Sequence, residues 1–304
     1  MVIYRLISAL IVMLGVSSIT FSLLHVVPGD PVEVMLGESA SVADREALRV
    51  DLGLDKPVFE QWLSFQSNLV KGEFGDSLYS KKPIIELIAE RAPWTAILAL
   101  ASLLVALLLA IPLGTLAALR VGTFWDSMAS SVSLIGVSIP NFLFGPLLII
   151  VFSIWAGWFP TSGNESASAI ILPAITLGAS LAAILARMIR ASLLDVLGEE
   201  FVVAARARGL SKTTVLFRHV FPNAALPILT IIGLQLGALL GGAVITEIIF
   251  AWPGIGQLLI EGIQRRDYPV VQTCVLLVSF IYVVVNMLTD VAYSYADPRI
   301  NFGR

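Results

Sequence analysis

The stretch EEFVVAARARGLSKTTVLFRHVFP, Glu199–Pro222, is basic and amphipathic and lies between two long apolar runs. Residues Glu200–Arg208 are good helix formers, Gly209 supplies a C-terminal stop, and Ser211 supplies the next N-cap. A second helix is expected over Lys212–Phe221, ending before the proline that closes the stretch. The pattern therefore predicts a helical hairpin outside the apolar phase, joined to a membrane-spanning helix at each end.

Composition places the chain among membrane proteins. Hydrophobic residues make up 57% of the sequence and charged residues only 13%, whereas a soluble domain has about 25% charged residues. The net charge of -3 says little, because membrane proteins segregate charge by side. We expect an all-α, polytopic membrane protein.

Six apolar segments are long enough to cross a bilayer, since about 20 helical residues span the hydrocarbon core. They run approximately over Ile7–Val27, Thr95–Leu119, Val132–Trp155, Ile170–Met188, Pro227–Phe250 and Val270–Ala292. The first is too long for the apolar region of a secretory signal, and no small-residue cleavage site follows it. We therefore expect six transmembrane helices.

Lysines and arginines in the short loops indicate the orientation. With the N-terminus inside, the outer short loops hold only Arg265 and Arg266. The inner side holds Arg5, Arg120, Arg187, Arg190, Arg206, Arg208, Lys212, Arg218, Arg299 and Arg304. Both termini are therefore predicted to be cytoplasmic.

The loop from Pro28 to Trp94 has helix signals of its own. Ser41 with Asp44 forms a capping pattern before a helix that stops at Gly53, and further helices are expected after Pro57 and Pro83. We predict two parts: residues 1–94, a first transmembrane helix with a long external (periplasmic) helical cap, and residues 95–304, a five-helix core with a cytoplasmic loop at 189–226. Two alternatives stay open for the cap helices: they fold for a partner, or they lie on the bilayer surface.

The order of residues in the basic stretch resembles a known loop. Val203-Ala204-Ala205, three residues, Gly209, nine residues, and then His219-Val220-Phe221-Pro222 is similar to the E-A-A-x3-G-x9-I-x-L-P loop of permeases in ATP-binding-cassette (ABC) importers. The two alanines, the glycine and the proline match in register. Val203, His219 and Phe221 stand where that pattern has Glu, Ile and Leu.

Other segments extend the resemblance to the dipeptide/oligopeptide/nickel ABC importer permease family, and within it to the first, B-type subunit. They are Pro28-Gly29-Asp30-Pro31, Leu52-Gly53-Leu54-Asp55-Lys56-Pro57, Gly72-Glu73-Phe74-Gly75-Asp76-Ser77, Ala204 to Leu210, Phe250-Ala251-Trp252-Pro253-Gly254-Ile255-Gly256, Arg266-Asp267-Tyr268-Pro269 and Asp297-Pro298-Arg299. The implied fold is that of a type I ABC importer permease in the bacterial inner membrane.

The resemblance implies partners. Such a subunit pairs with a second, C-type permease, two cytoplasmic ATP-binding subunits and an external solute-binding protein, with membrane lipid around it and no nucleic acid. The chain carries no phosphate-binding loop, so ATP and Mg belong to the ATPase subunits and no cofactor is expected on this chain. Residues expected to couple to the ATPases are Ala204, Ala205, Arg206, Arg208, Gly209, Leu210, Arg218 and Pro222.

Polar groups and glycines within the spans give further candidates. Side chains that can line a translocation path, or form interhelical hydrogen bonds, are Ser138, Asn141, Gln235 and Asn286. Gly233, Gly237 and Gly241 recur every four residues, which favours close helix packing. An external gate or docking surface is predicted at Trp252, Pro253, Arg265, Arg266 and Asp267.

The cargo and two other function classes stay open. Dipeptides, longer peptides, glutathione-like compounds and nickel complexes are all handled within the resembled family. The two histidines, His25 and His219, are predicted on opposite sides of the membrane, so no metal site is expected. A self-sufficient secondary transporter is a poor fit to six spans with one dominant cytoplasmic loop. A membrane-embedded enzyme lacks a visible catalytic cluster, so we expect no catalytic residue.

Overall fold

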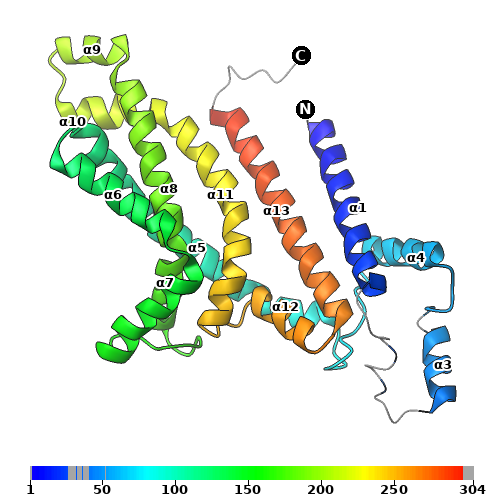
Figure 1. The fold of residues 1–304 in the computed structure, drawn as a ribbon. Helices are drawn as coiled ribbons and strands as arrows, with labels where there is room; N and C mark the ends of the chain where they lie inside the picture. Colours follow the sequence, from blue (N-terminus) through cyan, green and yellow to red (C-terminus); the bar gives the residue numbers. More distant parts are fainter. Residues whose placement is uncertain (1, 27–31, 33–35, 37–40, 52, 297–304) are drawn as a thin grey trace. The chain divides into compact units, whose positions relative to one another are not determined.

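The computed structural model describes residues 2–26, 32, 36, 41–51 and 53–296, and within them it is all-α (Figure 1). Two of the motifs of the resembled family, Pro28-Gly29-Asp30-Pro31 and Asp297-Pro298-Arg299, lie outside these residues. The chain divides into two compact units. Unit 1 comprises Met1–Trp94 and Pro253–Val283, and unit 2 comprises Thr95–Trp252 and Val284–Arg304.

Unit 1 is built around a small apolar core at the start of α5 (Ile84–Leu119). Its other elements are α1 (Val2–Val26), α3 (Val42–Asp51), α4 (Val58–Lys71), α12 (Ile255–Gln264) and the first part of α13 (Tyr268–Ala296). Buried side chains at the core are Ile84, Ile88, Ile255, Leu258, Val270 and Cys274. The single cysteine is thus a packed apolar residue.

The predicted helix signals in the first loop are confirmed. The Ser41 hydroxyl accepts a hydrogen bond from the backbone N–H of Asp44 at 3.2 Å, which caps α3. Gly53 adopts a left-handed φ of 66°, and the N–H of Leu54 closes the helix end on the Arg49 carbonyl. Helices α4 and α5 begin directly after Pro57 and Pro83, where a missing N–H costs nothing.

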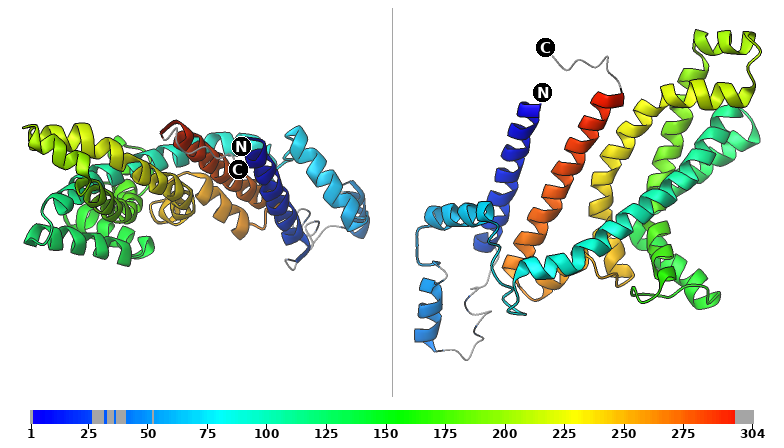
Figure 2. Two further views of the ribbon diagram at one scale, coloured as in Figure 1. Left: turned by 90° about the horizontal axis from the view of Figure 1, so that it is seen from above. Right: turned by 180° about the vertical axis from the view of Figure 1, so that it is seen from behind.

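Unit 2 packs around α8 (Ile171–Leu197), which contacts α6 (Phe124–Ser138), α7 (Asn141–Leu148) and α11 (Phe221–Ile249). More than half of the most apolar part of α8 is buried, so it is the central helix of this unit. The remaining elements are η1 (Ile149–Trp155), η2 (Ala167–Ile170), α9 (Glu200–Ala207), α10 (Lys212–Val215) and η3 (Leu216–Val220). Figure 2 gives two further views.

Four of the six predicted spans overlap helices that are apolar enough for a membrane. Four are long and apolar enough to cross a bilayer: 84–119, 167–197, 212–237 and 268–289. A fifth results if the bent pair 124–136 and 141–155 counts as one span, and the apolar part of α1 over Leu6–Ser22 is shorter. The number six and the side of the termini stay predictions.

The predicted third span is not one straight helix. It breaks between α6 and α7, which are bent by 102° at a short gap (Figure 1). Pro140 is the cause: it has no N–H to continue the helix, and it forces the preceding Ile139 into an extended conformation with φ −88° and ψ 115°.

The predicted helix end before Pro222 is also wrong. Helix α11 begins at Phe221 and runs on through Pro222 and Pro227. Pro222 lies in the first turn of α11, where no intrahelical N–H bond is required, and the preceding five residues form the wider π-helical turn η3. The hairpin is thus continuous with the membrane helix.

Close helix contacts in unit 2 depend on glycines. A Cβ added at Gly178 would lie 2.6 Å from the Ser102 carbonyl oxygen of α5, and one at Gly114 would lie 2.6 Å from the Ala186 carbonyl oxygen of α8. A methyl group at Gly233 would overlap the Thr289 side chain of α13. In lipid, such close backbone approach is a main source of helix association.

Replacing Gly178 with valine should lower the thermal stability of the detergent-solubilised protein. The added side chain cannot fit against α5, and overpacking of this kind costs about 1–3 kcal/mol. The matched control is Gly241→Ala, because a Cβ at Gly241 meets open space. We expect the Tm of Gly178→Val to fall by several degrees while Gly241→Ala stays close to the parent; equal Tm values would contradict the packing argument.

Candidate functional site

The hairpin begins with a helix that ends in a Schellman motif. Gly209 has a left-handed φ of 79°, its N–H donates to the Arg206 carbonyl, and the Leu210 N–H donates to the Ala205 carbonyl. Ser211 then caps the next helix by accepting from the Thr214 N–H at 3.2 Å. Both signals are local, and the structure has both at the predicted positions.

The two arms of the hairpin bury a small apolar seam. Val202 and Ala205 of α9 are buried, as are Val215, Leu216 and Val220 of the second arm. Ala205 is only 5% exposed, so it faces the hairpin interior and is not free for a partner. The exposed members of the predicted coupling set are Ala204, Arg206, Arg208, Gly209, Leu210, Arg218 and Pro222.

The structure adds apolar residues to this surface that the motif did not indicate. Val203 is 60% exposed and Phe217 is 68% exposed, and Phe201 is also exposed. Phe217 stacks on Phe221 with ring centroids 5.6 Å apart, which fixes its orientation. We call the exposed residues of the predicted coupling set together with Phe201, Val203 and Phe217 the hairpin surface. It combines guanidinium groups with apolar side chains, a composition enriched at protein interfaces.

An ion pair fixes the end of α8 that leads into the hairpin. Arg190 donates from Nε to Asp126 Oδ1 at 2.7 Å and from Nη2 to Oδ2 at 2.9 Å. The Gly122 N–H donates to the same carboxylate at 3.1 Å. Asp126 is mostly buried, so this bidentate pair holds the start of α6 against α8. In the sequence Arg190 indicates only the orientation, because no local pattern links two residues 64 positions apart.

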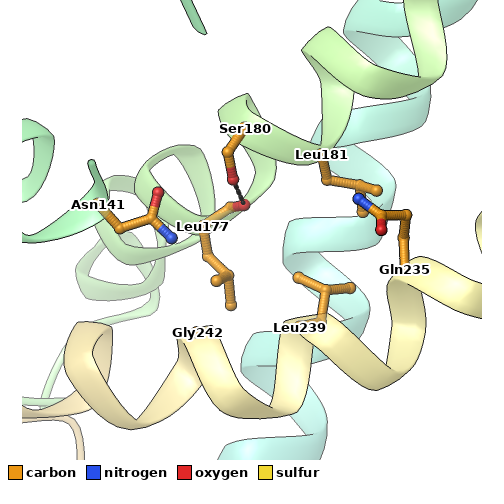
Figure 3. Close-up of a pocket in the computed structure, with 7 residues that line it drawn as sticks. All are labelled: Asn141, Leu177, Ser180, Leu181, Gln235, Leu239 and Gly242. Carbon is orange, nitrogen blue, oxygen red and sulfur yellow. Dashed lines mark hydrogen bonds between the residues drawn. The ribbon is translucent and has the colours of Figure 1, made fainter. Parts of the chain in front are cut away.

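Two of the predicted path residues, Asn141 and Gln235, lie at one pocket of about 70 Å³ between α7, α8 and α11. Figure 3 shows their amide groups at opposite ends of it. The lining residues are Asn141, Leu177, Ser180, Leu181, Gln235, Leu239 and Gly242. Ser138 donates to the Leu134 carbonyl of its own helix, and neither Ser138 nor Asn286 is among the lining residues.

Of the glycine stripe, Gly233 and Gly237 are buried and Gly241 is exposed. A Cβ at the neighbouring Gly242 would lie 2.9 Å from Leu177 Cδ1 and 3.5 Å from Asn141 Nδ2. The glycine that borders the pocket is therefore Gly242, which the four-residue spacing did not single out.

In unit 1, one residue of the predicted outer surface, Asp267, is buried and forms hydrogen bonds within the protein. Asp267 is 3% exposed and accepts three hydrogen bonds: from Ser77 Oγ at 2.5 Å, from the Leu78 N–H at 3.1 Å and from the Tyr79 N–H at 3.2 Å. It therefore ties the segment before α5 to the turn before α13. Asp267 is not part of an exposed docking surface, which corrects the prediction.

The other residues predicted there differ in exposure. Arg265 and Arg266 are exposed; the Arg265 guanidinium lies 4.1 Å from the centre of the Tyr79 ring, and Arg266 has a positive φ of 53°. Pro253 is partly buried. Trp252, in unit 2, is only 2% exposed, and its backbone N–H donates to the Glu247 carbonyl. Trp252 is thus a core residue and not part of an exposed docking surface, while a role in an external gate stays a prediction.

Comparison with known proteins identifies the class. Residues 110–302 match the family described as binding-protein-dependent transport system inner membrane component, and residues 1–99 match the N-terminal family of the same membrane components. The chain belongs to this permease family. It is a multi-pass protein of the inner membrane, as the sequence predicted.

Curated relatives match along almost the whole permease. The glutathione transport system permease protein GsiC of Escherichia coli (strain K12) is 40% identical over 301 residues, covering 99% of this chain and 98% of the relative. GsiC of Shigella dysenteriae serotype 1 (strain Sd197) gives the same identity and coverage.

Solved structures share the fold. A chain of the MetNI methionine ABC transporter in an inward-facing conformation matches with a TM-score of 0.59 and 20% identity, covering 71% of the permease and 98% of that chain. An amino acid ABC transporter crystallised with histidines matches with a TM-score of 0.53 and 18% identity, covering 71% and 95%. The resemblance to type I ABC importer permeases is therefore confirmed at the level of the fold.

Replacing Asp267 with asparagine should loosen the segment before α5. An asparagine offers one acceptor oxygen in place of two, so at least one donor among Ser77, Leu78 and Tyr79 loses its partner, at a cost of about 1–3 kcal/mol. Trypsin cleavage of the assembled complex after Lys81, which is exposed, should become faster.

The matched control for this change is Glu261→Gln. Glu261 pairs with Arg91 at a longer 3.9 Å and both side chains are partly exposed, so its loss should change cleavage little. Cleavage that is equally slow in Asp267→Asn would show that the hydrogen bonds of Asp267 do not hold this segment.

Proposed function

We propose that the permease is the transmembrane subunit of an ABC importer for small peptides, glutathione and related tripeptides among them. Support for this class of cargo comes from the relative GsiC, which is named as a glutathione transport system permease protein. GsiC is 40% identical to this chain over 99% of its length. The single observation that carries the import mechanism is the hairpin surface, presented by a rigid hairpin that is continuous with α11.

The hairpin is suited to receive force from an ATPase subunit. Its arms share the buried seam of Val202, Ala205 and Val220, so it moves as one body. Arg206, Arg208 and Arg218 can form bidentate pairs with carboxylates of a partner. In this proposal two ATP-binding subunits hydrolyse ATP with Mg, and this chain supplies neither nucleotide site nor catalytic residue.

The hairpin also joins two of the three helices that line the pocket. Helix α8 contributes Ser180 and enters the hairpin at its end, and α11 leaves the hairpin and contributes Gln235 and Gly242. A displacement of the hairpin would therefore change the separation of the pocket walls. We assign the pocket to one side of a translocation path whose other side comes from a second permease subunit.

The chemistry of the pocket fits a peptide. Asn141 and Gln235 each carry an amide that can donate to a carboxylate or carbonyl and accept from an N–H, while the leucines exclude water. A volume of about 70 Å³ holds roughly two water molecules, not a tripeptide, so the path must widen during transport. An external solute-binding protein would deliver the cargo.

Reversing charge on the hairpin surface should uncouple transport. We expect Arg208→Glu to lower ATP-dependent uptake by reconstituted complex about tenfold, the equivalent of one disrupted charged contact, and to reduce crosslinking from a cysteine at Ala204 to the ATPase. Lys212→Ala, on the same hairpin but outside the predicted set, is the control. Uptake by this chain alone, driven by an ion gradient without ATPase subunits, would instead support a secondary transporter.

Removing the pocket amides should impair peptide uptake specifically. We expect Asn141→Leu and Gln235→Leu each to lower the uptake of glutathione and of dipeptides about tenfold, because a buried carbonyl or carboxylate of the cargo loses its partner. Leu181→Met, which changes the same lining without changing polarity, should transport normally. Normal glutathione uptake by both leucine variants would place the path elsewhere.

A further inference from the structure

Helix α4 has an apolar face that is exposed among the residues that the structure describes. Phe59, Leu63 and Val70 are spaced four and seven residues apart, so they share one side of the helix. Their exposed fractions are 67%, 47% and 91%. We call these three residues the outer stripe of α4.

The adjoining side of α4 is fixed against α1. Trp62 Nε1 donates to Ser18 Oγ at 3.1 Å, and Gln66 Nε2 donates to Ser17 Oγ at 2.9 Å. The rings of Phe65 and Phe21 pack with centroids 5.6 Å apart. Helix α4 therefore crosses α1 at a steep angle, as both views of the ribbon show (Figures 1 and 2).

These contacts lie inside the first apolar span. Arg5 marks the cytoplasmic start of that span, and an apolar layer about 30 Å thick would extend some 20 residues beyond it. Ser17 and Phe21 are then about 6–12 Å below the outer boundary of the layer. Helix α4, held against them, is at the depth of the outer-leaflet acyl chains and not in the aqueous phase.

Polar residues of α4 lie about a quarter turn around the helix from the outer stripe. Glu60, Ser64, Ser67 and Lys71 are all exposed, and their spacing separates them from the outer stripe. An apolar face beside a polar face, at that depth, is the pattern of a helix lying in the plane of the membrane interface. The neighbouring surface of α1 is apolar and exposed in the same way at Leu10, Ile11 and Ile19.

We propose that acyl chains of the outer leaflet cover the outer stripe, so that α4 is an in-plane membrane anchor and not a docking helix for a protein. In this placement the outer stripe and the exposed apolar side chains of α1 form one lipid-facing surface. The stripe is then not a separate patch on the external cap. The contact does not depend on the cargo, and it would hold equally for any importer to which this chain belongs.

Depth-dependent fluorescence quenching in the assembled importer tests this placement. The buried Cys274 is first replaced by alanine, and an environment-sensitive dye is attached to Leu63→Cys or to Val70→Cys in lipid nanodiscs. Ser64→Cys, an exposed position on the polar side of the same helix, is the matched control. Quenchers are a lipid with a nitroxide on its acyl chain and aqueous iodide, applied separately.

We expect the acyl-chain nitroxide to quench dyes at positions 63 and 70 about twofold more than the dye at position 64, with the reverse order for iodide. Phe59→Cys should follow the pattern of positions 63 and 70 and provides an independent site. Stronger quenching by iodide at positions 63 and 70 would overturn the proposal. So would protection from both quenchers, or protection that develops only when solute-binding protein is added, since each would mean that protein covers the stripe.

Discussion

The bilayer interior offers no hydrogen-bond partners to the backbone, and the rest of the structure depends on this constraint. Each apolar segment must satisfy its own N–H and C=O groups, so every segment in the described part of the membrane region is helical. Helices with apolar surfaces gain little from burying them against one another in lipid. Their association must come from close packing, which is why Gly114, Gly178 and Gly233 lie at the tightest contacts of unit 2.

The ends of helices that depend on a few neighbouring residues could be predicted from the sequence. Gly209 as a helix stop, Ser211 and Ser41 as caps, and Pro57 as a helix start each act through the conformation of a few neighbouring residues. Contacts between residues far apart in the sequence could not be predicted from it. The Asp267 carboxylate binds residues about 190 positions away, and Arg190 finds Asp126 across 64 positions, so neither pair leaves a pattern in the sequence.

The orientation of short helices was a further limit. Helix α9 has only two turns, so its sequence does not fix which side faces the second arm of the hairpin. The motif marks Ala204 and Ala205 alike, yet the first is exposed and the second is buried. Prolines show the same dependence on context: Pro140 breaks a helix in mid-span, whereas Pro222 lies in a first turn and leaves α11 intact.

The connection between α8 and α11 links the candidate sites in unit 2. From Ser180 at the pocket to the end of α8 at Leu197 is about 26 Å of continuous helix. That helix is held near its C-terminal end by the Arg190 pair and near Ser180 by the close contact at Gly178. On the return path η3 avoids a break at Pro222, and α11 reaches Gln235 and Gly242 without interruption. In the proposed mechanism, a displacement of the hairpin would therefore reach the α8 and α11 walls of the pocket through continuous helices.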